Sequence, residues 1–432
     1  MATRIVAEWG RLRKVAVHRP GFEMFLGLLN PKASLYERAF NQELAENEHD
    51  SLRNALHDQF GVEVVVLREQ LSALSEKNPK LRKRLTMAAM DRIEFKGSEA
   101  DARLAKNEML CSTDSFDSSY FINIIMLKPS MSARKGTGIG AVHINITERD
   151  PMSDLYFMRD QQVVTDRGIF MSRMSTPQRA AETTLTRLLW EAMGMPVIGE
   201  VSAPGRLEGG DFMPLGDFAL IGTGERTNTD GARQLLKYGQ SFPEVSIVHQ
   251  PRNPLFHYPP GEPMSDMHLD TYFNVAGKGV AVGSESLLRL ATVETYFKEG
   301  DSYVRSKGTS NLYDYVKSKG FEIIGLSPLE QLAYASNFLC ISDRKILAVE
   351  TKSTIGKTII NLERKAAKEK GRYANALRMA KREYAKLVSS GSAFPHKREL
   401  RENGIEAYSI DLSNITGGYG GAHCMTAALQ RG

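Results

Sequence analysis

Residues 168–201 read GIFMSRMSTPQRAAETTLTRLLWEAMGMPVIGEV, and this stretch decides the class of fold. It begins with a short apolar run typical of a strand, continues into a segment with helical character, and returns to a second strand-like run. Residues 218–250, FALIGTGERTNTDGARQLLKYGQSFPEVSIVHQ, repeat the same order of elements. The sequence therefore predicts an α/β protein built from strand, helix and strand units.

More strand-like runs continue this rhythm, beginning at Val62, Lys278 and Lys345. The units start at irregular intervals of about 50 to 65 residues, which is looser than a solenoid repeat. The spacing fits a few ββαβ modules arranged around an axis, and it fits an ordinary α/β sheet equally well. The pattern alone leaves both arrangements open.

Two segments interrupt the rhythm within what we expect to be a single catalytic domain over residues 1–432. Residues 72–120 predict a helical insertion, because apolar residues recur there at helical spacing. Residues 352–398 predict a second, basic helical insertion, in which Gly371 is expected to break or bend the helix. The apolar stripe of this second insertion consists of Tyr373, Leu377, Ala380, Tyr384 and Leu387.

The composition is that of a globular protein, with 432 residues, 42% hydrophobic and 25% charged. The longest apolar clusters are too short to cross a bilayer, and the N-terminal segment lacks the apolar run of a secretory signal. The cysteines, Cys111, Cys340 and Cys424, are three and widely spaced, which suits a reducing compartment. We therefore expect a cytoplasmic protein with no membrane partner.

The formal net charge of +5 raises the question of a polyanionic partner. Residues 361–387 contain nine Lys and Arg against three Asp and Glu, a local charge of +6. The remainder of the chain therefore sums to −1, and nucleic acid is not expected as a partner of the catalytic body. The basic insertion is a candidate for contacts within a homo-oligomer.

Four short motifs carry residues capable of chemistry. The segment TGGYGGAHCMT places Cys424 after four closely spaced glycines, which allow backbone amides and a thiol to approach a ligand closely. In LEGGDFMP, either Glu208 or Asp211 can face a cleft while the other braces the turn. The dipeptide spacing in MHLDT would point His268 and Asp270 to one face of an extended strand, and FMRD ends in Asp160.

Together these motifs supply one thiol, one imidazole and several carboxylates. Carboxylates match the forked donors of a guanidinium in bidentate fashion, so the set suits a planar cationic substrate. A nucleophilic cysteine with a histidine base is the usual pairing for covalent catalysis. Acidic surroundings raise the pKa of a thiol until a cation binds, so such a substrate would help to activate its own nucleophile.

On these motifs the chain resembles the arginine deiminases of the guanidino-modifying superfamily. The resemblance runs nearly end to end, from LRKVAVHRPGFE through FMRD, LEGGDFMP, IGTGERT and MHLDT to GGAHCMT. It implies a five-bladed β/α propeller, the pentein fold, built from ββαβ modules with helical insertions. It also implies hydrolysis of L-arginine to L-citrulline and ammonia through a covalent amidino intermediate, with no metal or organic cofactor.

The resemblance also implies a role for each matching residue. Cys424 would be the nucleophile, and His268, hydrogen-bonded to Glu208, would protonate the leaving ammonia and then activate water. Asp160 and Asp270 would hold the guanidinium nitrogens. The remaining residues of the implied substrate site are Arg179 and Arg226, which would grip the α-carboxylate, and Phe157, which would line the aliphatic stem.

Two positions depart from the family pattern. Tyr419 stands five residues before the nucleophile, where deiminases usually carry an arginine, and Asp154 stands six residues before Asp160 in place of the usual asparagine. Losing one charge-assisted hydrogen bond would cost about ten- to a hundredfold in affinity. Either Arg179 and Arg226 compensate, or the carboxylate end of the site is altered.

Three functions are therefore compared. Arginine hydrolysis is the first. The second, amidino transfer or hydrolysis of another guanidino or ureido compound, needs the same cysteine, histidine and carboxylates, so the sequence separates the two poorly. The third is a non-catalytic pentein that binds RNA through the basic insertion. The presence of Cys424 and His268 argues against this third function, because a binding module does not need them.

Overall fold

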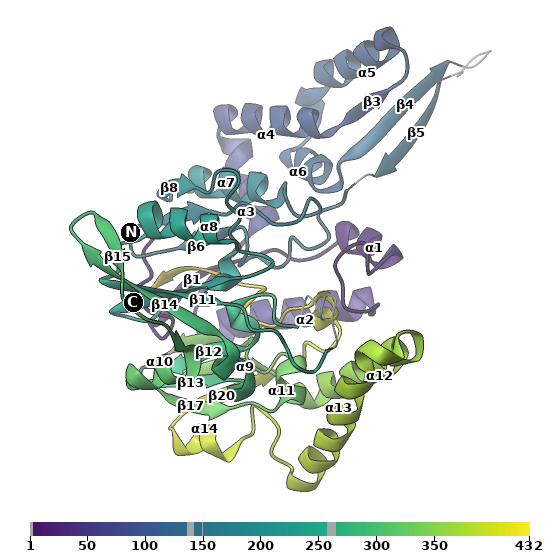
Figure 1. Ribbon diagram of the computed structural model, residues 1–432. Coiled ribbons are helices and arrows are strands. Elements are labelled where there is room, and N and C mark those ends of the chain that lie inside the picture. The colour runs from purple at the N-terminus through teal and green to yellow at the C-terminus, as the bar shows by residue number, and fades with distance from the viewer. Residues whose placement is uncertain (1–2, 136–141, 149, 257–264) are drawn as a thin grey trace.

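The structure is a computed structural model, and it describes residues 3–135, 142–148, 150–256 and 265–432 (Figure 1). Five three-stranded units in this part of the chain share one pairing pattern, in which a central strand is antiparallel to one neighbour and parallel to the other. Their strands, in chain order, are β1 (Leu12–Val17), β2 (Glu63–Val66), β6 (Gln162–Val164), β7 (Ile169–Met171), β8 (Val197–Glu200), β9 (Phe212–Pro214), β10 (Phe218–Thr223), β11 (Glu244–His249), β12 (Phe273–Gly277), β13 (Val280–Gly283), β17 (Glu322–Gly325), β18 (Leu339–Ser342), β19 (Lys345–Val349), β20 (Glu406–Ile410) and β21 (Ala427–Arg431).

The unit over residues 168–201 shows how these modules are built. Strand β7 is followed by α7 (Glu182–Ala192), and β8 then pairs with β7 in parallel. The helix buries one face, including Trp190, against the sheet. Residues 218–250 repeat this order with β10, α8 (Thr229–Gln234) and β11. The predicted order of strand, helix and strand is confirmed in both stretches.

The first and last strands of the chain lie in one sheet. β21 pairs antiparallel with β1, with Ala427 opposite Ala16, so the segment that carries Cys424 enters a buried strand directly. Both chain ends lie close together in Figure 1. This pairing fixes the C-terminal glycine segment against the body of the protein.

Further strands extend this framework. One of the five units is widened into a larger sheet by β14 (Thr292–Glu299), β15 (Ser302–Arg305) and β16 (Ser310–Asn311). A separate sheet is formed by β3 (Glu94–Lys96), β4 (Pro129–Lys135) and β5 (Val142–Glu148).

The segment predicted as purely helical at 72–120 also contains a strand. Its helices are α3 (Leu67–Lys77), α4 (Pro79–Arg92), α5 (Glu99–Cys111) and the start of α6 (Ser118–Leu127). Strand β3 lies between α4 and α5 and pairs in parallel with β4. The helical spacing found in the sequence is correct for α4, which buries Leu81, Leu85 and Ala89, whereas Ile93 lies just after its end. The strand was missed because it is only three residues long.

The second predicted insertion contains a helical hairpin, α12 (Thr351–Lys368) and α13 (Lys370–Ser390), at the opposite end of the molecule from α5 in Figure 1. The break between the helices falls at Glu369, so the expectation of a break at Gly371 was wrong. Tyr373 and Ala380 are buried against α11 (Pro328–Leu332) and its neighbours, but Tyr384 is exposed.

The other helices are short and cover the sheets. They are α1 (Phe22–Leu29), α2 (Gln42–Asn54), α9 (Glu285–Leu290), α10 (Leu312–Ser318) and α14 (Arg398–Glu402). No helix within the described ranges is both long enough and apolar enough to span a bilayer.

Candidate active site

Cys424 lies in the turn between η6 (Ile415–Gly418) and β21, and its side chain is buried. Asn337 holds this thiol on two sides. Its Nδ2 donates to Cys424 Sγ at 3.0 Å, and its Oδ1 accepts from the backbone N–H of Cys424 at 3.0 Å and of Gly421 at 2.8 Å. A single buried amide therefore fixes both the nucleophile and the glycine turn before it.

The glycines before Cys424 are required by close packing. A Cβ atom on Gly420 would lie 2.4 Å from the ring of Phe157 and 2.9 Å from Cys424 Cβ. A Cβ atom on Gly418 would lie 1.8 Å from the hydroxyl oxygen of Tyr156. Any side chain at these positions would displace the aromatic wall of the site.

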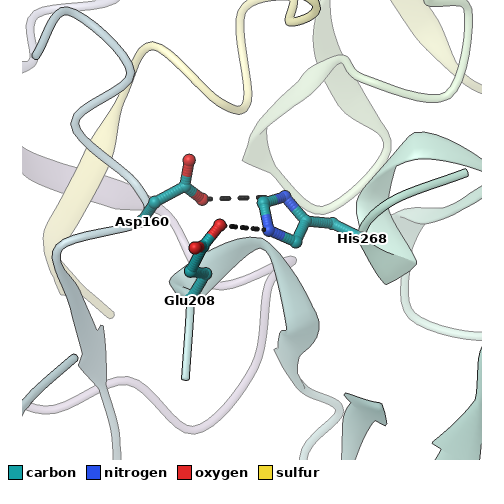
Figure 2. A group of neighbouring side chains, drawn as sticks. All are labelled: Asp160, Glu208 and His268. Atoms are coloured by element: carbon teal, nitrogen blue, oxygen red, sulfur yellow. Dashed lines mark hydrogen bonds and ion pairs between the residues drawn. The ribbon is translucent and has the colours of Figure 1, made fainter. Parts of the chain in front are cut away.

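His268 and Glu208 form a buried pair (Figure 2). His268 Nε2 lies 2.9 Å from Glu208 Oε2, and both side chains are excluded from solvent. Burial lowers the pKa of His268, but Asp160 and the hydrogen bond to Glu208 outweigh it and raise that pKa to about 9. Burial raises the pKa of Glu208, yet His268 and Arg226 hold it below its usual range. The pair is therefore an imidazolium and a carboxylate at neutral pH.

Asp270 and Cys424 are in contact, with the Sγ atom 3.5 Å from Asp270 Oδ2. The same carboxylate oxygen accepts a hydrogen bond from His423 Nδ1 at 2.7 Å. Although burial opposes ionisation of Asp270, His423 holds its pKa below the usual value. The thiol thus faces a carboxylate that stays ionised.

The strand predicted for MHLDT is wrong. His268 has an extended backbone, but Leu269–Thr271 form a 3₁₀ turn, η5, before β12 begins at Phe273. Asp211 anchors this turn, since its Oδ1 accepts from the backbone N–H of Leu269 at 3.0 Å. In LEGGDFMP, Glu208 is therefore the carboxylate that faces the site and Asp211 the one that braces the turn.

Burial, followed by the carboxylates of Asp270 and Asp160, raises the pKa of the Cys424 thiol well above its usual value. The thiol therefore stays protonated until a positive charge enters the site. This is the behaviour expected from the acidic surroundings of the sequence motifs.

Asp160 lies just before β6 and receives a hydrogen bond from a buried guanidinium. Arg179 Nη1 donates to Asp160 Oδ2 at 2.7 Å, and Arg179 Nη2 donates to Glu182 Oε2 at 2.9 Å. The other oxygen of Asp160 accepts from the backbone N–H of Gly210 at 3.2 Å and lies 3.8 Å from His268 Nδ1. Asp160 thus already binds a guanidinium within the protein.

Arg226 lies on the far side of Glu208. Its Nη1 is 3.9 Å from Glu208 Oε1 and 3.3 Å from the hydroxyl oxygen of Ser175. Ser175 donates to the same Glu208 oxygen from its hydroxyl at 2.7 Å and from its backbone N–H at 2.9 Å. Glu208 is therefore fixed from both ends, which leaves Oε2 directed at His268.

The two departures from the family pattern both lie near the site. Tyr419 has a left-handed backbone with φ of 73°, and its hydroxyl accepts from Lys365 Nζ at 3.2 Å. Asp154 is buried, and its Oδ2 has no hydrogen-bond partner within the described residues. Burial raises the pKa of Asp154 to about 8 against the opposing charge of Arg179. Asp154 is therefore a neutral acid at pH 7.

Phe157 is buried and packs against Tyr156, with ring centroids 4.2 Å apart. Its ring also meets the backbone of Gly418 and Gly420. Phe157 therefore forms an apolar wall between the FMRD segment and the nucleophile turn.

The sequence patterns did not reveal a buried network behind the nucleophile. Glu8 contacts Arg159 at 2.6 Å, Arg431 at 3.1 Å and His423 Nε2 at 3.8 Å. Glu8 is buried, but Arg159 and Arg431 hold its pKa well below the usual value. Asn337 was also missed, as was Glu182. Only the position of His423 beside Cys424 offered a signal, because the other contacts join distant segments.

Asp160, Glu208 and His268 also satisfy the spacing of a cation site. One ligand atom from each lies within 4.8 Å of the others. Two carboxylates and an imidazole are suitable ligands for zinc. Here Arg179 already neutralises Asp160 and His268 already pairs with Glu208, so the group supplies acceptors and a proton within one small volume.

Comparison with known proteins agrees with this geometry. The chain is similar to solved structures of the same α/β fold: the N-terminal domain of ArgZ covalently bound to a reaction intermediate (TM-score 0.51, 13% identity, 97% of this chain and 98% of the other) and AgrE in complex with ornithine and NAD⁺ (TM-score 0.50, 12% identity, 98% of this chain and 40% of the other).

Curated relatives extend over nearly the whole chain. The arginine deiminase of Halobacterium salinarum is 24% identical, with 98% of this chain and 96% of the relative aligned. The arginine deiminase of Oenococcus oeni is 22% identical over the same shares, and that of Streptococcus pyogenes is 26% identical over 82% and 90%. The family model for arginine deiminase matches residues 33–431, and the chain therefore belongs to the arginine deiminase family.

Proposed function

We propose that the protein hydrolyses L-arginine to L-citrulline and ammonia, with Cys424 as the covalent nucleophile. The convergence of a thiol, an imidazolium and two carboxylates in one buried volume carries this proposal. Membership of the arginine deiminase family supports the choice of substrate.

Asp160 and Asp270 are the proposed acceptors for the guanidinium. Asp160 already accepts from the guanidinium of Arg179, so its geometry suits this ligand. Asp270 contacts Cys424 Sγ, so a guanidinium nitrogen bound to Asp270 brings the central carbon close to the sulfur. The bound cation also offsets the two carboxylates that keep the thiol protonated.

In the first step, Cys424 Sγ attacks the guanidinium carbon and a C–S bond forms. The C–N bond to one terminal nitrogen then breaks, and His268, which is charged at neutral pH, supplies the proton with which ammonia departs. The thiol proton replaces the one that His268 has given up. The product is an amidino thioether on Cys424.

In the second step, His268 takes a proton from water, and the resulting hydroxide attacks the same carbon. The C–S bond breaks, the sulfur recovers a proton, and the ureido group of citrulline leaves. Glu208 holds the imidazole ring through Nε2 in both steps. The overall reaction consumes one water per arginine and needs no external oxidant or reductant.

The substrate stem and its far end are assigned to the residues around Phe157. Phe157 packs along the methylene chain, and Arg179 and Arg226 contribute positive charge toward the α-carboxylate. Tyr419 and Asp154 border the same end, where Asp154 is a neutral acid able to donate a hydrogen bond to a carboxylate.

We also propose that the five similar sheets are the blades of a β/α propeller, with segments 72–120 and 352–398 as insertions in one catalytic domain. The shared pairing pattern and the joining of β1 to β21 support this arrangement. A homo-oligomer is supported by the exposed apolar side chains Tyr384 and Val388 on α13. The free thiols, of which Cys111 is exposed, support residence in the cytoplasm.

The decisive experiment is product analysis after incubation with L-arginine. Equimolar citrulline and ammonia are expected, and ornithine that forms only when a second amine is supplied would instead identify an amidino transferase. Mass spectrometry after an acid quench should find the amidino group on Cys424.

Cys424→Ala should abolish citrulline formation, with Cys111→Ala as the matched control because Cys111 is exposed and far along the chain from the site motifs. Full activity of folded Cys424→Ala would disprove the covalent mechanism. Circular dichroism and the thermal unfolding midpoint establish that each variant is folded.

A further inference from the structure

A cavity of about 620 Å³ opens between the segment at 30–37 and the α12–α13 hairpin. The cavity is lined by four cationic side chains, Lys32, Lys365, Lys368 and Arg372, and by two carboxylates, Glu37 and Glu369. Its wall on the nucleophile side includes Tyr419. The cavity thus adjoins the glycine turn of Cys424 from outside the buried site.

The carboxylates of this cavity are already compensated. Glu37 pairs with Arg38, and it accepts further hydrogen bonds from Tyr334 at 3.0 Å and Asn361 at 3.0 Å. Glu369 lies 3.5 Å from Arg372. The lining therefore carries a net positive charge, which favours an anionic group.

Lys365 connects this cavity to the catalytic turn. Its Nζ donates to the hydroxyl of Tyr419 at 3.2 Å and lies 5.7 Å from the centre of the Tyr419 ring. The same ammonium lies 5.6 Å from the centre of the Tyr373 ring on α13. Two aromatic rings from separate segments therefore hold the charge of Lys365 at the boundary between cavity and turn.

From Tyr419 the chain leads directly to the nucleophile. The next residue, Gly420, lies so close to Cys424 that an added Cβ would be 2.9 Å from Cys424 Cβ. The catalytic side chains themselves are buried, so a substrate whose guanidinium reaches Cys424 must leave its opposite end toward the surface. The inner cations, Arg179 and Arg226, each lie beside carboxylates of the site.

We propose that Lys365, positioned by Tyr419, binds the α-carboxylate of the substrate, and that the cavity between residues 30–37 and α12–α13 is the carboxylate end of the substrate site. This rests on the proposed arginine hydrolysis. It assigns the second insertion a role in substrate recognition, because Lys365 belongs to α12. It also supplies the cation that Tyr419 itself lacks.

The test compares Lys365→Met with Lys352→Met. Methionine keeps most of the apolar stem of lysine and removes the charge. Lys352 is an exposed lysine of the same helix that does not line the cavity. Steady-state kinetics are measured with L-arginine and with agmatine, which carries the guanidinium but no carboxylate.

Lys365→Met should raise KM for L-arginine by roughly ten- to a hundredfold and change kcat by less than about twofold, since only a ground-state contact to a charged group is lost. Turnover of agmatine should not change, Lys365→Arg should restore most of the affinity for arginine, and Lys352→Met should match the parent protein. An unchanged KM for arginine, or an equal loss with both substrates, would overturn the proposal.

Binding in the Cys424→Ala background separates this proposal from the proposed reaction. Calorimetry with L-arginine should show weaker binding after Lys365→Met, whether or not the parent enzyme forms citrulline. If arginine binds through Lys365 but is not hydrolysed, only the proposed function fails. If citrulline forms and Lys365→Met binds arginine as well as the single variant does, only the present inference fails.

Discussion

Asn337 and Cys424 are joined by hydrogen bonds in both directions. The amide Nδ2 of Asn337 donates to the sulfur at 3.0 Å, while its Oδ1 accepts from the Cys424 backbone N–H at 3.0 Å. The first bond favours the thiolate, whereas burial, Asp270 and Asp160 favour the thiol. Asn337 is therefore the neutral group that opposes two carboxylates at the nucleophile.

Replacing Asn337 by alanine should make the thiolate harder to form. A hydrogen bond to a charged group contributes about 1.5 to 3 kcal/mol, which corresponds to roughly one to two pKa units. At fixed pH, alkylation of Cys424 by iodoacetamide should therefore slow by about ten- to a hundredfold. The control is Asn403→Ala, which removes a surface amide bonded only to the backbone of Glu399. Alkylation of Asn337→Ala at the parent rate would show that this contact does not tune the thiol.

The imidazolium of His268 should set the alkaline limit of activity. Because the pKa of His268 is about 9, kcat should fall as the pH rises above about 9 and the proton for the leaving ammonia is lost. Glu208→Gln removes the negative charge that raises this pKa, so the alkaline limb should move to lower pH by about one unit or more. Glu299→Gln, at an exposed position, should leave the limb in place. The pH dependence of kcat and an NMR titration of His268 measure both shifts, and an unmoved limb in Glu208→Gln would contradict the assignment.

Asp154 should make the protein less stable as the pH rises. Its folded pKa of about 8 lies above the value of roughly 3.9 in an unfolded chain, so the folded state binds the extra proton between these values. The free energy of unfolding therefore falls as the pH rises through this window, and Asp154→Asn should remove that part of the fall. Urea unfolding at pH 5 and pH 9 measures the difference. Asp301→Asn, on the surface, should keep the parent slope, and a parent slope in Asp154→Asn would exclude a raised pKa.

Two glycine substitutions should act in opposite directions. Gly420→Ala places a methyl group 2.4 Å from Phe157, so we expect a loss of about 1 to 3 kcal/mol in stability and a large drop in activity. Gly371→Ala meets no atom within 4 Å and lies inside α13, so it should stabilise the protein by about 0.4 to 1 kcal/mol with full activity. Thermal unfolding and citrulline assays report both effects. Normal activity of Gly420→Ala would show that the turn has room for a side chain.

The local patterns predicted much of the architecture. The strands and helices of residues 168–201 and 218–250 were predicted because apolar periodicity is set by which face an element buries, and that is written in nearby residues. The strand expected at His268 was wrong because Asp211, 58 positions away, accepts the Leu269 N–H and stabilises a turn. Backbone hydrogen bonds to distant side chains leave no periodic signal.

The candidate site divides in the same way. The chain by itself determined the chemical types and their order: a thiol after glycines, an imidazole, and three carboxylates at turns, with two departures at Tyr419 and Asp154. Only the tertiary structure decided that Asn337 binds the thiol, that Glu8 lies behind His423, and that Lys365 meets Tyr419. The physical reason is that sequence spacing fixes what one element presents, whereas contacts between residues 54 to 415 positions apart depend on how the sheets and helices pack.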